Sequence, residues 1–125
     1  MRSQKKIVLI DKDHHICNVV KMCVEVFSNW QVTTARSVEE GLATSVKVRP
    51  DAILLDMLML RKDGFDVLEK LRADSELVDI PVVLLTTPIE LTESQNIVRL
   101  RVQGAISKPF YSTKLASQIS QILGW

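Results

Sequence analysis

The feature that most constrains the fold is a series of five short strand-like segments, most of them apolar throughout. They are Ile7–Ile10, Gln31–Ala35, Ala52–Leu55, Val82–Leu85 and Ala105–Ser107. Continuous apolar runs of this length are typical of strands that are covered on both faces, as in parallel sheets. Between these segments the apolar residues recur at helical spacing, so strands and helices alternate along the chain.

Each intervening segment carries its own helix signals. The first helix has the apolar stripe Ile16, Val19, Val20, Cys23, Val24 and Phe27, with Asp13 as its N-cap. The second helix begins at the capping box Ser37–Glu40 and ends before Pro50, and the third follows Asp63-Gly64 and carries Val67, Leu68 and Leu71. The fourth runs from the capping box of Thr92 and Gln95 to Gly104, and the fifth spans Leu115–Leu123.

Five strands that alternate with five helices imply parallel pairing through right-handed crossovers. The expected fold is α/β, a doubly wound parallel sheet with helices on both faces. A chain of 125 residues is about one domain long, so residues 1–125 are expected to form one domain.

Composition excludes several classes of protein. The chain is 46% hydrophobic and 25% charged with a net charge of +1, which argues against disorder and against nonspecific nucleic-acid binding. No apolar stretch approaches a bilayer span, and Met1–Lys6 has no apolar signal region behind it. We therefore expect a cytoplasmic protein without membrane or direct nucleic-acid partners. Cys17 and Cys23 match no redox or zinc spacing, so we predict reduced thiols in the core.

Four polar residues close the apolar strands: Asp11, Asp56, Thr86 and Lys108. In doubly wound sheets, ligands bind beyond the carboxyl ends of the strands, so these side chains are expected to converge. Two carboxylates, a hydroxyl and an ammonium there suit a phosphoryl group, with an Asp as nucleophile and a hard cation beside it.

The order and spacing of these residues resemble the receiver domain of bacterial response regulators, over essentially the whole chain. Leu54–Met59 is similar to the family's phosphorylation strand and following loop, and Asp63-Gly64 stands where that loop meets the next helix. Lys108-Pro109-Phe110 is the second local motif. The chain is most similar to stand-alone receivers of the chemotaxis-regulator type.

The resemblance implies a flavodoxin-like sheet of order 2-1-3-4-5 and a role in two-component signal transduction. A sensor histidine kinase, a phosphotransfer protein or a small phosphodonor would phosphorylate Asp56, and Thr86 and Lys108 would bind the phosphoryl oxygens. Such a domain is not an enzyme beyond its own phosphorylation and dephosphorylation. It also implies a cis peptide bond before Pro109.

For the cofactor, the resemblance implies Mg²⁺ bound by Asp11, Asp56 and the backbone carbonyl of Leu58. Receivers usually have a second acid directly after the first, and here that position is Lys12. An ammonium within about 4 Å opposes a cation by roughly 4 kcal/mol at an effective dielectric near 20. Lys12 could turn to solvent, Asp13 could act as a substitute ligand, or Lys12 could itself replace the ion. We expect weakened Mg²⁺ binding rather than its complete loss.

Three further positions depart from the family pattern. Ala105 stands where receivers carry the aromatic residue of their output switch, so signalling would run through the loop after Thr86. Leu58 and Pro88 stand where polar side chains often orient the hydrolytic water, which predicts slow self-dephosphorylation. Leu60 replaces a common Pro in the same loop.

Three functions remain open at this point. The first is a phosphoacceptor switch that binds a downstream protein through the face of its fourth helix, fifth strand and fifth helix. The second is a pseudo-receiver, an interaction module that works without phosphorylation. The third, a small flavodoxin-like enzyme or nucleotide binder, is disfavoured because no Gly-rich phosphate loop follows any strand.

Overall fold

The computed structural model describes residues 4–56, 66–86 and 102–125. Its strands are β1 (Lys6–Ile10), β2 (Gln31–Ala35), β3 (Ala52–Asp56), β4 (Val82–Thr86) and β5 (Gly104–Ser107). Its helices are α1 (His14–Phe27), α2 (Val38–Val48), α4 (Asp66–Ala73) and α6 (Leu115–Leu123). The predicted helix that begins at Thr92 lies outside the described residues.

The strands form one parallel sheet of order β2-β1-β3-β4-β5, which confirms the flavodoxin-like topology predicted from the sequence. Four strands are one residue longer than predicted, because backbone pairing continues past the apolar run. Asp56 pairs with Leu85, and Thr86 pairs with Ser107. The polar residues expected just beyond β3 and β4 are therefore the last residues of those strands.

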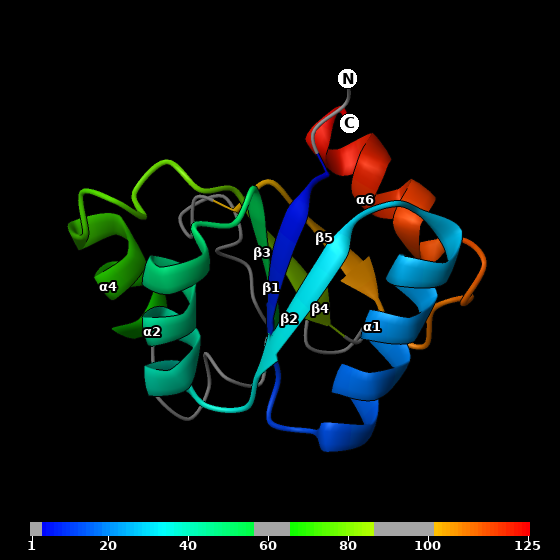
Figure 1. Cartoon of the computed structure of the whole chain (residues 1–125), viewed down its shortest axis with the longest axis horizontal. Coiled ribbons are helices and arrows are strands. Elements are labelled where there is room, and N and C mark those ends of the chain that lie inside the picture. Colours follow the sequence, from blue (N-terminus) through cyan, green and yellow to red (C-terminus); the bar gives the residue numbers. More distant parts are fainter. Residues whose placement is uncertain (1–3, 57–65, 87–101) are drawn as a thin grey trace.

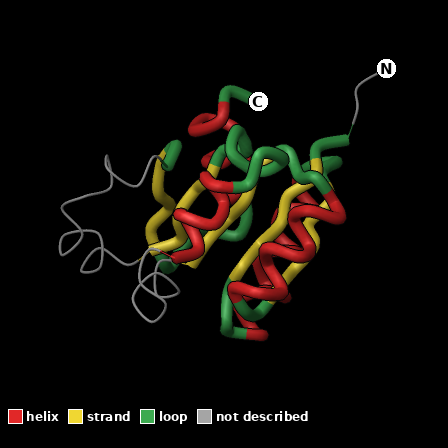
Figure 2. Tube along the Cα trace, turned by 90° about the vertical axis from the view of Figure 1, so that its left-hand side faces the viewer, coloured by secondary structure: helices red, strands yellow, loops and turns green. Residues whose placement is uncertain are grey.

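Helices cover both faces of the sheet, with α2 and α4 on one side and α1 and α6 on the other (Figure 1). Figure 2 looks onto the side of α2 and α4 and shows helices in front of the strands. β1 runs from the end of the molecule where α6 finishes to the end where α1 begins. Because all strands are parallel, their carboxyl ends share that second end of the molecule.

Side chains of the strands alternate between two apolar clusters, one under each helix layer. In β1, Val8 and Ile10 pack with the cluster that includes Leu68 and Leu71 of α4. Ile7 and Leu9 pack with residues of α1 and α6. Each fully buried aliphatic side chain stabilises the fold by about 2 kcal/mol relative to exposure. This double burial explains the continuous apolar runs in the sequence.

The second cluster also holds the two cysteines. Cys17 and Cys23 are free thiols, buried on the face of α1 that meets the sheet. The prediction of reduced core thiols is confirmed.

Side chains cap the N-termini of α1 and α2, as the sequence predicts. The carboxylate of Asp13 accepts hydrogen bonds from the backbone N–H groups of His15 and Ile16, which caps α1. The hydroxyl of Ser37 accepts from the N–H of Glu40 and caps α2. α2 ends at Val48, two residues before Pro50.

None of the helices within the described ranges is both long enough and apolar enough to cross a bilayer.

Gly41 of α2 lies against β1 so closely that a methyl group would collide with Ile10. A Cβ at this position would lie 2.5 Å from Cδ1 and 2.7 Å from Cγ1 of that side chain. Glycine therefore sets how near α2 approaches the strand that leads to Asp11.

We expect Gly41→Ala to lower the free energy of unfolding by about 1–3 kcal/mol through overpacking, even though alanine favours helices. Urea unfolding would measure the change, and Ile10→Val in the same chain should recover part of it. Ala43→Gly, at an exposed position of the same helix, calibrates helix propensity alone at about 1 kcal/mol. A Gly41→Ala variant as stable as the parent would contradict the close contact.

Candidate functional site

Four side chains predicted to form a site come from four strand ends at one edge of the sheet. Asp11 follows β1, Asp56 ends β3, Thr86 ends β4 and Lys108 follows β5. Asp11, Asp56 and Thr86 are buried, although their side chains are polar. Buried polar groups of this kind need partners, so their surroundings decide what the edge can do.

Lys108 joins the two acids. Its Nζ lies 3.4 Å from Oδ2 of Asp11 and 3.3 Å from Oδ1 of Asp56. The side chains of Asp11 and Asp56 are 0% and 6% exposed, and that of Lys108 is 19% exposed. The three residues thus form a largely desolvated ion cluster, the acidic pocket, with one negative charge in excess when both acids are ionised.

Backbone contacts orient the chain on both sides of this pocket. The N–H of Asp11 donates to the carbonyl of Ala35 at 3.0 Å, and the carbonyl of Asp11 accepts from the thiol of Cys17 at 3.3 Å. The N–H of Asp13 donates to Oδ1 of Asp11 at 2.9 Å. These three hydrogen bonds hold the backbone and the carboxylate of Asp11, and the sequence analysis assigned none of them to the site. Cys17 lies six residues beyond Asp11, which no simple motif would mark.

The last strand brings Lys108 into place. Its backbone N–H donates to the carbonyl of Thr86 at 2.6 Å, and its peptide bond to Pro109 is cis, as the resemblance implies. Burial by itself would lower the pKa of Lys108. The charges of Asp56 and Asp11, with hydrogen bonds to both, outweigh burial and raise its pKa above the ordinary value.

A raised pKa fixes the pH range in which Lys108 supports the fold. Its stabilising contribution is fully present through the acidic and neutral range, and it is lost only as the pH rises through the pKa of the folded state. The ammonium is therefore charged at neutral pH.

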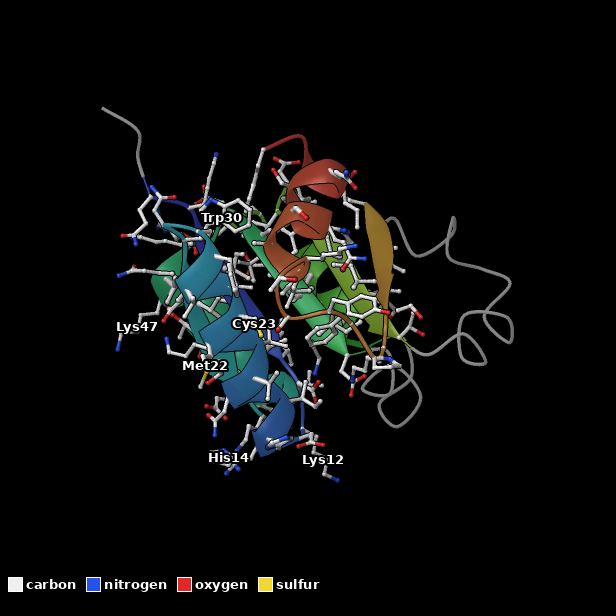
Figure 3. The ribbon with its side chains drawn as sticks, turned by 90° about the vertical axis from the view of Figure 1, so that its right-hand side faces the viewer. Lys12, His14, Met22, Cys23, Trp30 and Lys47 are labelled. Carbon is white, nitrogen blue, oxygen red and sulfur yellow. The ribbon has the colours of Figure 1, made fainter. Side chains whose placement is uncertain are left out.

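The structure shows one of the arrangements considered for Lys12 and Asp13. The carboxylate of Asp13 caps α1, so it does not serve as a substitute ligand in this structure. Lys12 is exposed, and Figure 3 shows its side chain projecting away from the body at the end where α1 begins. Of the outcomes considered for Lys12, the structure contains the one in which it turns outward.

The donors of the acidic pocket do not fit a dedicated Mg²⁺ site. Among the described residues, no group of three or more His, Cys, Asp or Glu side chains could hold a metal ion. One oxygen of each carboxylate contacts Lys108, and the other oxygen of Asp11 accepts from a backbone N–H. A divalent ion would have to compete with an ammonium already bound to both acids.

Ala105 is the residue predicted to replace the aromatic member of the family's output switch. It is partly buried and packs against the cluster on the side of α2 and α4. Leu58, Leu60 and Pro88, which bear on the active-site loops, lie outside the described residues. So does the predicted fourth helix, whereas β5 and α6, the other two elements of the face expected to meet a downstream target, are described.

Replacing Lys108 by Met should lower the free energy of unfolding by roughly 3 kcal/mol at pH 8, because two buried carboxylates would then face each other without a counter-ion. The deficit should shrink at strongly alkaline pH, because the parent protein loses its own ammonium as the pH rises through the raised pKa of Lys108. Urea unfolding across this pH range tests both effects, with Lys47→Met at an exposed position of α2 as control. A deficit that does not change with pH would contradict the assigned role of the ammonium.

A family model described as the response regulator receiver domain matches residues 7–120. The DNA-binding dual master transcriptional regulator RpaA of Synechocystis sp. is 31% identical over 121 residues, covering 94% of this chain and 48% of RpaA. The hybrid signal transduction histidine kinase D of Dictyostelium discoideum is 29% identical over 120 residues, covering 95% of this chain and 8% of the kinase. The chain spans about half the length of the transcriptional and response regulators it matches.

Among solved structures, the chemotaxis response regulator CheY4 of Vibrio cholerae is similar with a TM-score of 0.84 and 25% identity, covering 96% of this chain and 99% of CheY4. Receiver domains are signalling modules that interact with histidine kinases or phosphotransfer proteins and with downstream targets, and they generally use Mg²⁺ for phosphorylation. The fold, the strand order and the match over residues 7–120 place this chain in the family of response regulator receiver domains.

Proposed function

We propose that the chain is a phosphoacceptor switch, in which Asp56 takes a phosphoryl group from the phosphohistidine of a sensor kinase or phosphotransfer protein. One observation carries the proposal: the ammonium of Lys108 bridges the carboxylates of Asp11 and Asp56 in a largely desolvated pocket. A structural ion pair needs one acid. Two buried acids on one lysine, at the edge where doubly wound sheets bind ligands, favour a reactive site.

Each residue of the proposed site has a separate role that follows from the chemistry of its side chain. The carboxylate of Asp56 is the nucleophile, since its position at the end of β3 puts it at the open edge of the sheet. Lys108 and the hydroxyl of Thr86 bind the phosphoryl oxygens and balance their charge. Asp11 keeps Lys108 in place before the reaction. Mg²⁺ binding is weakened, because Lys108 occupies both acids and Lys12 replaces an expected acidic ligand.

The phosphorylated domain would signal by binding another protein. Since Ala105 has no ring that could rotate inward, the change would pass from Thr86 into the loop and helix that follow it. The downstream partner would meet the face of the fourth helix, β5 and α6.

A pseudo-receiver is the second candidate, and Lys12 and Ala105 favour it. Both replace residues on which the family's phosphorylation and output depend. In that case Lys108 would serve as a permanent counter-ion, and the domain would bind its partner in one constant conformation.

Treatment with acetyl phosphate and Mg²⁺ should add the mass of one phosphoryl group to the intact protein. Asp56→Asn should abolish the gain, because an amide is not a nucleophile toward phosphorus. Asp79→Asn, a matched change at an exposed position, should leave it intact. A folded parent protein that gains no mass with this donor or with phosphoramidate would support the pseudo-receiver instead.

Once formed, the phosphoryl group should persist for minutes or longer. Neither Leu58 nor Pro88 has a side chain that could orient a water molecule for attack. Removing the donor by gel filtration and following intact mass with time measures the decay, and Leu58→Asn should accelerate it. Loss of the group from the parent protein within seconds would contradict this expectation.

A further inference from the structure

The charges around the acidic pocket differ from those that a divalent cation requires. Lys108 contacts both carboxylates, and Asp11 has its second oxygen on the N–H of Asp13. Asp13 cannot turn inward without uncapping α1, because its carboxylate accepts from two N–H groups of the first turn. The described side chains thus offer two acids that already share a cation.

Lys12 adds a second positive charge at the same end of the molecule. It follows Asp11 directly, and its exposed side chain projects into solvent beside the start of α1 (Figure 3). An ammonium on a flexible four-carbon stem can change direction without moving the backbone. In the unphosphorylated pocket Lys108 contacts both acids and leaves one negative charge in excess, which does not outweigh the desolvation cost of moving Lys12 inward.

Phosphorylation changes this balance. An oxygen of the Asp56 carboxylate forms a bond to phosphorus while the bond from phosphorus to the leaving oxygen of acetyl phosphate breaks. Acetate departs with the electron pair, and no proton moves. The side chain of Asp56 thereby goes from one negative charge to two, and the negative charge in excess within the acidic pocket doubles from one to two.

We propose that Asp56 is phosphorylated without a divalent cation, and that Lys12 turns in to join Lys108 in supplying the positive charge. The inference rests on the proposed phosphoacceptor function. It assigns to Lys12 a binding role for the phosphoryl oxygens, which a primary ammonium with three donors can fill. The same residue then explains why the donor set does not fit Mg²⁺ and how the site works without it.

The first test compares rates of mass gain from acetyl phosphate in Mg²⁺ and in excess EDTA. The parent protein should react at similar rates in both. In EDTA the rate of mass gain of Lys12→Ala should be at least about tenfold lower than that of the parent. Lys12→Asp adds a third carboxylate and should react only when Mg²⁺ is present. Lys47→Ala, at another exposed lysine, should behave like the parent.

The second test measures metal binding without any reaction. Calorimetric titration with MgCl₂ should detect little binding to the parent protein and clear binding to Lys12→Asp. Thermal unfolding should agree, since a ligand that binds only the folded state raises the melting temperature. Tryptophan fluorescence is unsuitable, because Trp30 lies at the opposite end of the molecule from Lys12 (Figure 3).

The outcomes separate this inference from the function on which it rests. If the parent reacts with Mg²⁺ but not in EDTA, or if Lys12→Ala reacts in EDTA as fast as the parent, the inference is wrong and the phosphoacceptor function stands. If the folded parent reacts under neither condition, the phosphoacceptor function itself fails. Should Lys12→Asp not fold, the parent and Lys12→Ala still decide the question.

Discussion

The ion cluster of Asp11, Asp56 and Lys108 is the interaction on which the rest of the structure depends. Two carboxylates buried side by side repel each other, and each loses its hydration, so the carboxyl edge of the sheet would be unstable without an ammonium between them. The ammonium arrives from β5, two strands away from β3. Correct pairing of β4 with β5 is therefore a condition for burying both acids.

The sheet makes this convergence simple. Since every strand is parallel, residues that end separate strands reach the same edge whatever their distance in sequence. A continuously apolar strand presents alternate side chains to the two faces of the sheet. Each strand therefore contributes to both apolar clusters, one under each layer of helices. Gly41 adds a local adjustment, because its missing side chain lets α2 approach the strand that ends before Asp11.

The apolar pattern was sufficient to predict the strands, and the polar residues at their ends predicted that Asp11, Asp56, Thr86 and Lys108 lie at one edge of the sheet. The order of the strands came from the resemblance to receiver domains. Strand ends were misjudged by one residue at Asp56 and Thr86, since polar side chains hid backbone pairing that continues. The hydrogen bonds to Asp11 from Cys17 and from the N–H of Asp13 could not be predicted. They depend on the angle between β1 and α1, which no residue type specifies.

The direction of the Lys12 side chain could not be predicted from the sequence either, because it depends on the charges that surround it in the folded chain. The sequence left three arrangements open: Lys12 turned to solvent, Asp13 as a substitute metal ligand, or Lys12 in place of the metal ion. They differ in which positive charge lies next to Asp11. In the structure Lys12 turns outward, Lys108 contacts both Asp11 and Asp56, and Asp13 caps α1. A phosphoryl group on Asp56 would double the negative charge in excess and so strengthen the attraction for Lys12. In the proposed mechanism, a lysine in place of an acid therefore matters most once the phosphoryl group is bound.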